Sequence, residues 1–210
     1  MGYWMLKLEP WIVLNSDKNP KNCILCLPGR GSHAGELVRW YNNELQMDDN
    51  LIVGITPELR CWYPLPNGPD DQTDAVEGIL KAKYTIERVI RKIGIPRKNM
   101  FLVGHSAGAV MAIQLSIHSP EPFAGVIVHS GAILEPKEVP ECQNDTPYLL
   151  IHSKDDVIFK WDERYLPMRD ALEERGYDIQ TYERDDGDHY MHPIQLLYAR
   201  AFINKVLNES

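Results

Sequence analysis

The feature that most constrains this chain is Gly104-His105-Ser106-Ala107-Gly108, a G-x-S-x-G motif set between two apolar segments. Residues 100–103 before the motif indicate a buried strand, and residues 109–115 after it suit a helix packed on that strand. Strand, motif and helix in this order predict a nucleophile elbow, a sharp turn that lifts the serine hydroxyl above a sheet. Such a turn strains the backbone of the serine, and the two glycines let the strand and the helix approach closely.

Composition and charge indicate one globular domain over residues 1–210. A hydrophobic content of 44% in a chain of this length is enough for a sizeable core. The net charge of −8 argues against nucleic acid or an anionic membrane as the main partner, because both require a basic face. We therefore expect a small-molecule partner and neither nucleic acid nor a membrane; a homodimer remains open.

The cysteines favour a reducing compartment. Cys23 and Cys26 have the spacing of a redox motif, but they lie in an apolar run that indicates a strand, where residues three apart face opposite sides. We interpret both as core or half-buried thiols, with a redox or metal role as the less favoured alternative. No Cys/His group has zinc spacing, residues 1–10 lack a signal-peptide pattern, and no run approaches the length of a membrane span. The sequence thus predicts a cytoplasmic protein with no metal.

Apolar runs alternate with helically spaced residues along the whole chain. Strands are expected at residues 3–8, 11–14, 23–27, 51–55, 100–103, 124–128, 148–151 and 179–182. Helices are expected around 37–45, at 73–93, 109–115 and 169–175, and from 193 onward. The inner faces of the first two helices are predicted to carry Leu37, Trp40, Tyr41 and Leu45, and Val76, Ile79, Leu80, Ile86, Ile90 and Ile93. The alternation predicts a mostly parallel, doubly wound α/β sheet with helices on both faces.

Candidate partners for the serine follow two late strands. A serine hydroxyl needs a base, and the base needs an orienting group. In parallel sheets, functional residues collect past the C-terminal ends of strands, and the partners of an elbow serine follow in the order Asp or Glu, then His. Asp155 and Asp156 follow one late strand, and His189 follows the next. Each of these loops alone is typical of solvated surface, but together with the elbow they predict a catalytic triad.

With these residues in place, the chain resembles the carboxylesterase, lysophospholipase and acyl-protein thioesterase branch of the α/β-hydrolases, from about residue 23 to the final helix. The acid of that branch usually sits in a pattern like H-G-x-x-D-x-V-V, and residues 152–159 here are H-S-K-D-D-V-I-F, which selects Asp156 over Asp155. The family histidine, usually preceded by glycine and followed four residues later by proline, matches His189, although Asp188 stands in the glycine position. The competing His192 is placed to begin the final helix. The resemblance implies an α/β-hydrolase fold without a large lid.

The resemblance also implies an oxyanion hole and a substrate cleft. The backbone N–H groups of Ala107 and Arg30 are the implied oxyanion donors, because residues 28–31 resemble the family's H-G-x-G with proline in place of histidine. The Arg30 side chain adds a charge close to this loop and is expected to face the leaving group. Trp62 and Tyr63, in a long proline-rich loop, resemble a cleft-lining stretch. They either wall a substrate pocket or, in the alternative reading of Trp62, pack the loop onto the sheet.

The sequence therefore predicts a serine hydrolase that cleaves carboxylic esters through an acyl-enzyme intermediate. The rigid, bulky residues 62–65 favour short acyl groups, from acetate to butyrate. The alternatives are a lysophospholipase or acyl thioesterase with the same triad, and a catalytically silent ligand-binding protein on the same fold. No metal or organic cofactor is implied.

Overall fold

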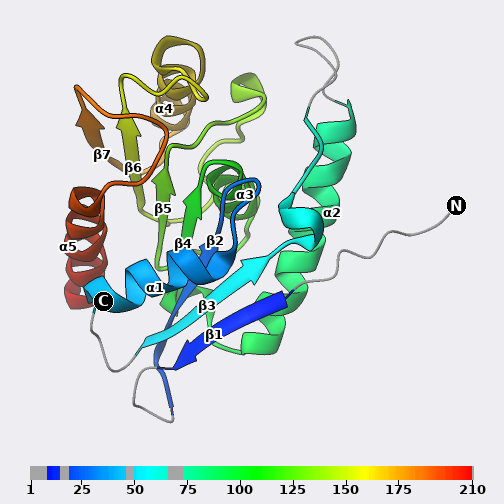
Figure 1. Ribbon diagram of the computed structural model, residues 1–210, viewed down its shortest axis with the longest axis vertical. Helices are drawn as coiled ribbons and strands as arrows, with labels where there is room; N and C mark the ends of the chain where they lie inside the picture. The colour runs from blue at the N-terminus through cyan, green and yellow to red at the C-terminus, as the bar shows by residue number, and fades with distance from the viewer. Residues whose placement is uncertain (1–8, 15–18, 46–49, 66–72, 210) are drawn as a thin grey trace, which may run out of the picture.

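The computed structural model describes residues 9–14, 19–45, 50–65 and 73–209, and these form a seven-stranded sheet in the order β1-β3-β2-β4-β5-β6-β7 (Figure 1). The strands are β1 (Glu9–Leu14), β2 (Asn22–Leu27), β3 (Asn50–Thr56), β4 (Met100–His105), β5 (Gly125–His129), β6 (Tyr148–Ser153) and β7 (Ile179–Arg184). The helices are α1 (Ala34–Leu45), α2 (Thr73–Ile93), α3 (Ala107–Ser116), α4 (Leu166–Glu174) and α5 (Pro193–Glu209).

The sheet is parallel except at one edge. β1 pairs with β3 in antiparallel register, and β2 to β7 form a six-stranded parallel sheet. The predicted strand at residues 11–14 lies within β1, whereas the one predicted at 3–8 lies outside the described residues. The mostly parallel, doubly wound α/β architecture is thus confirmed. Because parallel strands end at the same edge, the loops after β2, β4, β6 and β7 meet there, and these loops carry the predicted site.

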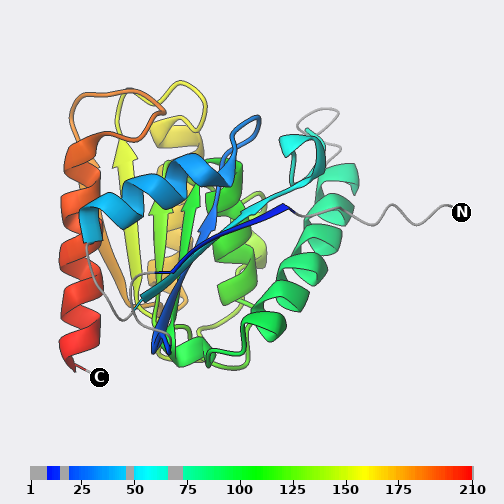
Figure 2. The same ribbon diagram turned by 60° about the horizontal axis from the view of Figure 1, so that its bottom comes forward.

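Helices cover both faces of the sheet and enclose two separate cores (Figure 2). Helices α1 and α5 lie on one face, and α2, α3 and α4 lie on the other. Cys23 belongs to the core beneath α2 and α3, and Cys26 belongs to the core beneath α1 and α5. Both thiols are free and fully buried, and burial raises the pKa of Cys23 to about 12. The interpretation of both as core thiols on opposite faces is confirmed.

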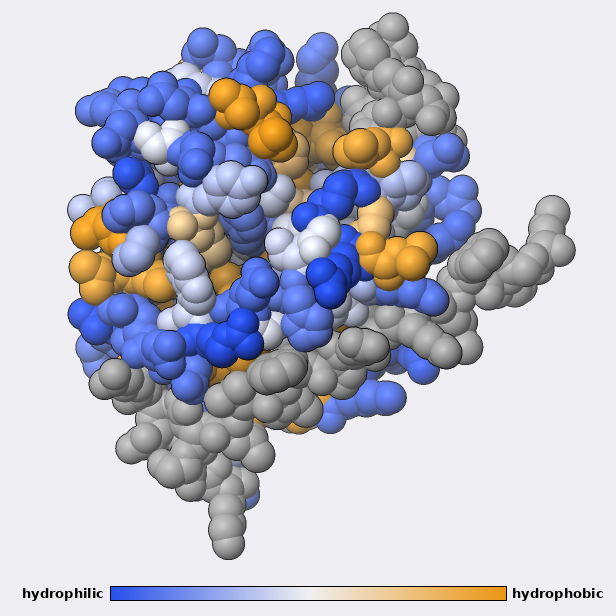
Figure 3. All heavy atoms as spheres, viewed as in Figure 1, coloured by the Kyte–Doolittle hydropathy of each residue, from blue (hydrophilic) through white to orange (hydrophobic). Residues whose placement is uncertain are grey.

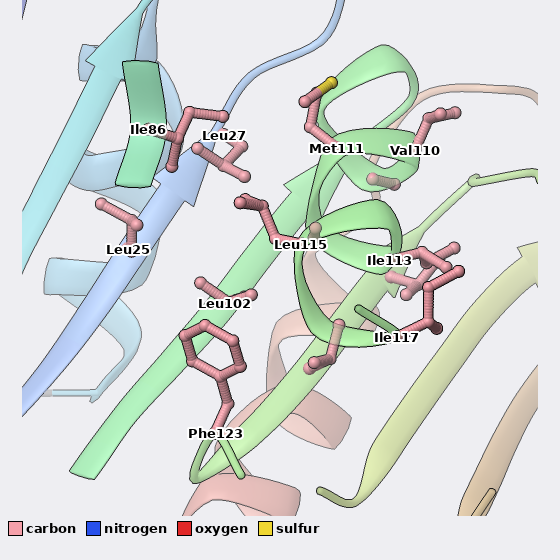
Figure 4. Packing of buried hydrophobic residues seen from close by; sticks show 14 of the residues in the cluster. Leu25, Leu27, Ile86, Leu102, Val110, Met111, Ile113, Leu115, Ile117 and Phe123 are labelled. Atoms are coloured by element: carbon pink, nitrogen blue, oxygen red, sulfur yellow. The ribbon is translucent and has the colours of Figure 1, made fainter. Parts of the chain in front are cut away.

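The core beneath α2 and α3 is built from aliphatic side chains of the central strands and the two helices. Figure 4 shows Leu25 and Leu102 of the sheet gathered with Leu115 of α3 and Ile86 of α2. All four side chains are fully buried. Burying one such side chain stabilises a fold by about 1.5–3 kcal/mol, so this packing fixes α3, and with it the serine at its start.

Two predicted helix faces need correction. The buried stripe of α2 runs through Ile79, Ile86 and Ile90, while Val76 and Leu80 are exposed. Val76 follows the buried Ala75 and Leu80 follows Ile79, and one position along a helix is a rotation of about 100° that carries each residue to the outer surface. Trp40 likewise lies on the outer side of α1 and is 38% exposed. Spacing alone could not separate these positions, because all of them are apolar.

The surface is mostly hydrophilic on the face shown in Figure 3, where hydrophobic residues form separate patches. Among the residues that the structure describes, no helix combines the length and the apolar character needed to cross a lipid bilayer.

Candidate active site

Ser106 occupies the sharp turn between β4 and α3 that the motif predicts. Its backbone is at φ 54° and ψ −120°, a left-handed conformation that strains a residue with a side chain. A Cβ on Gly104 would lie 2.4 Å from the Cα of Ala109, and a Cβ on Gly108 would lie 2.0 Å from the carbonyl oxygen of Leu27. Only glycine fits at these two positions, so strand and helix can pack closely enough to hold the turn.

Ser106, His189 and Asp156 form a continuous hydrogen-bonded chain. His189 Nε2 lies 2.7 Å from Ser106 Oγ, and His189 Nδ1 lies 2.8 Å from Asp156 Oδ2. The serine comes from the end of β4, the aspartate follows β6 and the histidine follows β7. Asp156 and His189 are buried, while Ser106 is partly exposed. The geometry therefore joins the three predicted residues in the predicted order, with the serine partly exposed.

The environment of Asp156 keeps its carboxylate ionised. Burial by itself would raise the pKa of Asp156, but the hydrogen bond and charge of His189 and the backbone amides of Phe159 and Ile158 together hold the pKa below its ordinary value. The two amides donate to Oδ1 at 2.9 and 2.8 Å, which leaves Oδ2 for the histidine. An ionised carboxylate on Nδ1 fixes the imidazole tautomer that leaves Nε2 free to accept the serine proton.

His105 is a supporting residue that the sequence reasoning missed. Its Nε2 donates to the backbone carbonyl of His189 at 3.0 Å, so the neighbour of the nucleophile holds the backbone of the histidine. Burial lowers the pKa of His105, which favours the neutral form required for a single donated proton. The motif signals only that position 105 is variable, and no pattern in the sequence links it to residue 189.

His152 supports the acid in the same way. Its Nε2 donates to the carbonyl of Phe159 at 2.8 Å, and its ring stacks on Tyr165 with centroids 4.5 Å apart. These contacts hold the turn from Asp156 to Phe159 in the shape that presents the carboxylate. The histidine of the family acid pattern is therefore explained by the contact it makes across that turn.

The other aspartates and His192 have the surroundings expected of them. Asp155, Asp185 and Asp186 are exposed, and Asp185 pairs with Lys154 at 2.6 Å. His192 is exposed directly before α5, and its Nδ1 accepts from the backbone amide of Ile194. Within the described ranges, no group of three or more His, Cys, Asp or Glu side chains is arranged to hold a metal ion.

The loop after β2 lies against the elbow. A Cβ on Gly29 would lie 3.2 Å from Ser106 Cβ, so the loop backbone passes directly beside the serine. Neither the Arg30 amide nor the Ala107 amide donates to a backbone carbonyl in the turns and loops of the described residues. Two N–H groups in this position are what an oxyanion hole requires. The assignment of Arg30 and Ala107 as donors stays a prediction that this geometry supports.

Trp62 and Tyr63 are not exposed cleft walls. Their exposed fractions are 2% and 5%, and both belong to the core beneath α2. The Trp62 indole N–H donates to the carbonyl of Pro28 at 2.7 Å, so this residue anchors the loop that carries Arg30. Of the two interpretations left open by the sequence, the structure thus shows the packing one for Trp62, and it places Tyr63 in the same core.

The Arg30 side chain contacts the loop after β3 and does not face the leaving group as expected. Its guanidinium donates to the carbonyl of Tyr63 at 2.6 Å and to Cys61 Sγ at 2.7 Å, and it lies over the Tyr63 ring at 5.7 Å. A cation satisfied by these contacts ties the loop after β2 to the loop after β3, and does not face a leaving group. The residue stays exposed, so the charge is screened by water.

Comparisons with known proteins indicate the family of the chain. A family model described as phospholipase/carboxylesterase matches residues 52–207. The chain is 24% identical over 115 residues to acyl-protein thioesterase 1 of Schizosaccharomyces pombe, a match that covers 51% of this chain and 51% of that protein. It is 28% identical over 112 residues to endo-1,4-beta-xylanase B of Butyrivibrio fibrisolvens, which covers 50% of this chain and 16% of that protein. The matches thus span about half of one curated relative and about a sixth of the other.

The fold has close counterparts among solved structures. The crystal structure of esterase PE8 superposes with a TM-score of 0.83 at 23% sequence identity, covering 95% of this chain and 99% of that one. At this identity the likeness shows the fold alone.

Proposed function

The chain belongs to the phospholipase/carboxylesterase family, and from that premise we propose that it is a serine hydrolase of carboxylic esters. The observation that carries the proposal is the chain of hydrogen bonds from Asp156 through His189 to Ser106, with the serine held in a strained elbow. A small ester is the partner, and a cytoplasmic location remains a prediction from the cysteine content.

In the proposed first half-reaction, His189 Nε2 takes the proton of Ser106 as Oγ attacks the acyl carbonyl. The carbonyl π electrons move to oxygen, and the amides of Arg30 and Ala107 stabilise the oxyanion that forms. Each such donor contributes about 3 kcal/mol of transition-state stabilisation. The C–O bond to the alkoxide then breaks, His189 gives its proton to the departing oxygen, and an alcohol and the acyl-enzyme result.

Water completes the reaction by the same route. His189 takes a proton from water, the hydroxide oxygen attacks the acyl carbon, and the Ser106 oxygen leaves with the proton from His189. The products are a carboxylic acid and the free serine, so atoms and charge balance over the two steps. Asp156 stays ionised throughout because its pKa is lowered, and its negative charge stabilises the imidazolium form of His189.

A fluorophosphonate probe followed by an ester series tests the proposal. We expect the wild-type enzyme to be labelled at Ser106 and the Ser106→Ala variant to remain unlabelled. An unlabelled wild-type enzyme would instead identify a ligand-binding protein on this fold.

The acyl series distinguishes the esterase from its closest alternative. Trp62 and Tyr63 are buried and do not line the acyl site, so the short-acyl preference rests instead on the exposed Val157 and Ile158 near His189, where a long chain stays in contact with water. We expect kcat/KM for p-nitrophenyl esters to peak between acetate and butyrate and to fall for octanoate and palmitate. Each buried methylene of a substrate gains about 0.8 kcal/mol, so a long groove would produce a steady rise through octanoate. That rise would favour the lysophospholipase or thioesterase alternative.

A further inference from the structure

A pocket of about 310 Å³ opens beside the elbow, between the first half of α1 and the segment that follows His189. Its size is at the small end of ligand-binding pockets, which span about 300–1,000 Å³. Its lining includes Gly29, Leu37, Trp40, His105, Tyr190 and Met191. His105 is part of the elbow, and a Cβ on Gly29 would lie 3.2 Å from Ser106 Cβ, so the pocket lies directly beside the site of Ser106.

The position of the pocket relative to His189 indicates which half of an ester it holds. The imidazole must hand its proton to the departing oxygen, so the alcohol half of the substrate lies on the His189 side of the serine. Tyr190 and Met191, the two residues after His189, form one wall of the pocket. A second wall is His105, whose Nε2 donates to the His189 carbonyl. The pocket therefore lies where the departing alcohol must lie.

The remaining flanks of the serine differ from this pocket. The flank formed by Trp62 and Tyr63 is closed, because both side chains are buried in the core. On the third flank, Phe159 packs edge-on against His189 with ring centroids 5.6 Å apart, and Val157 and Ile158 are exposed beside it. Among the described residues, an acyl group directed to that surface meets exposed side chains, whereas an alcohol group directed to the pocket is enclosed.

The walls of the pocket suit a flat apolar group. Trp40 is 38% exposed and Tyr190 is 72% exposed, so two aromatic rings stand at the pocket without burial in the core. Leu37 adds an apolar surface. Glu36 and Arg39 place opposite charges at the same pocket, which gives no net attraction for a charged alcohol. An apolar cavity of about 150 Å³ already accommodates benzene, so this pocket has room for one substituted ring.

We propose, on the premise that Ser106 is the nucleophile of an esterase, that this pocket binds the alcohol half of the substrate and selects compact aromatic alcohols. Trp40 and Tyr190 are its specificity-determining residues. Substrates of this class are esters of benzyl-like alcohols with short acids, such as acetate.

Two constitutional isomers test the proposal directly. Benzyl acetate carries its ring on the alcohol side, and methyl phenylacetate carries the same ring on the acyl side. We expect Trp40→Ala and Tyr190→Ala each to lower kcat/KM for benzyl acetate by about three- to tenfold, the usual value of one aromatic contact. For methyl phenylacetate the loss should be smaller, because its methyl alcohol group is too small to fill the pocket between the two rings. The ratio of kcat/KM for benzyl acetate to kcat/KM for methyl phenylacetate should therefore fall in each variant.

A matched control separates the pocket from a general effect of losing surface tyrosine. Tyr84 on α2 is 64% exposed and lies away from this pocket, so Tyr84→Ala should leave both esters unchanged. Thermal unfolding of each variant verifies that the fold is intact. Because the alcohol enters acylation only, the loss for benzyl acetate should persist when acylation is followed alone, as release of benzyl alcohol in the first turnover.

Each other outcome overturns the proposal. Sensitivity of methyl phenylacetate with benzyl acetate unaffected would assign the pocket to the acyl half. Equal losses for both isomers, or no loss for either, would show that the pocket does not select the alcohol. A wild-type enzyme that is labelled at Ser106 but hydrolyses no benzyl ester would also overturn it. Failure of the proposed function is distinguishable, since in that case the fluorophosphonate does not label Ser106.

Discussion

The aromatic residues on two sides of Ser106 have opposite surroundings. On the closed flank, Trp62 and Tyr63 are buried, and the Trp62 indole holds the carbonyl of Pro28. On the open flank, Trp40 and Tyr190 stand exposed at a pocket beside His189. The same residue types thus serve to fix a loop on one side and to leave a surface for a ligand on the other.

The difference shows how one site can be both rigid and accessible. The proposed oxyanion loop must be held in place before the reaction begins, because donors that have to reorganise contribute little. The closed flank does this through Trp62 and through the Arg30 guanidinium, which donates to the Tyr63 carbonyl. Gly78 completes the packing, since a Cβ there would lie 2.9 Å from the Tyr63 Cβ as α2 crosses. The open flank does not have to hold the oxyanion loop in place, so its side chains remain available to substrate.

The largest effect is expected at the residue that both flanks serve. Ser106→Ala removes the nucleophile, and we expect kcat for p-nitrophenyl acetate to fall by at least about 10⁴-fold, because members of such a triad act as a unit. The unfolding midpoint should stay near that of the wild type. Residual hydrolysis within about tenfold of the wild-type rate would contradict the triad assignment.

Substitution of Asp156 should give the next largest effect, and it tests which of the two adjacent aspartates faces His189. Asp156→Asn should lower kcat by about 10⁴-fold, because the amide selects the wrong tautomer of His189. The adjacent Asp155 is exposed, so Asp155→Asn is the matched control and should stay within about twofold. Steady-state hydrolysis of p-nitrophenyl acetate measures both. The reverse ranking would show that the loop presents the other carboxylate.

Acid should destabilise the folded protein through His129, a buried histidine that contacts α1. Tyr41 of α1 bonds to His129 Nε2 at 2.7 Å, and burial, with a smaller contribution from His105, lowers the pKa of His129 to about 3. The unfolded chain binds a proton at His129 below about pH 6.5 that the folded protein excludes, so acid favours unfolding. Between about pH 6.5 and 3 this histidine should reduce the free energy of unfolding by up to about 1.4 kcal/mol per pH unit.

Urea unfolding at pH 7, 6 and 5 measures this dependence. His129→Gln removes the titrating group, so the variant should have a flatter slope of unfolding free energy against pH, even though its stability at pH 7 is lower. An unchanged slope in the variant would assign the acid sensitivity to other groups.

The smallest expected effect compares the two flanks directly. Trp62→Phe keeps an aromatic ring but leaves the buried Pro28 carbonyl without its donor, which should cost about 1–3 kcal/mol of stability. Because the loop that carries Arg30 loosens, kcat should fall while KM stays near its wild-type value. Trp40→Phe, the same change on the open flank, should alter stability by less than about 0.5 kcal/mol. Equal losses at both positions would remove the distinction between the flanks.

The sequence predicted most elements of the fold because their signals are local. The apolar runs of the central strands, the glycines of the elbow, and the Gly94 and Gly176 stops all act within a few residues. Both stop glycines have positive φ, at 75° and 81°, as a helix end requires. The π-helical turn Trp161–Tyr165 before α4 was not predicted, because Tyr165 stacks on His152 and Trp161 lies tilted beside that ring, and these contacts form only in the folded chain.

By itself the sequence determined the elbow and the order of its partners, since a motif and its position after a strand constrain the backbone directly. The choice of Asp156 over Asp155 came from the resemblance of residues 152–159 to the family acid pattern. Only the tertiary structure decided which aromatics are buried, where the Arg30 guanidinium lies, and that His105 and His152 hold the backbone of the site. These features depend on contacts between segments far apart in the chain. Burial of an apolar ring is favourable in any core that has space for it, and the folded backbone determines which core that is.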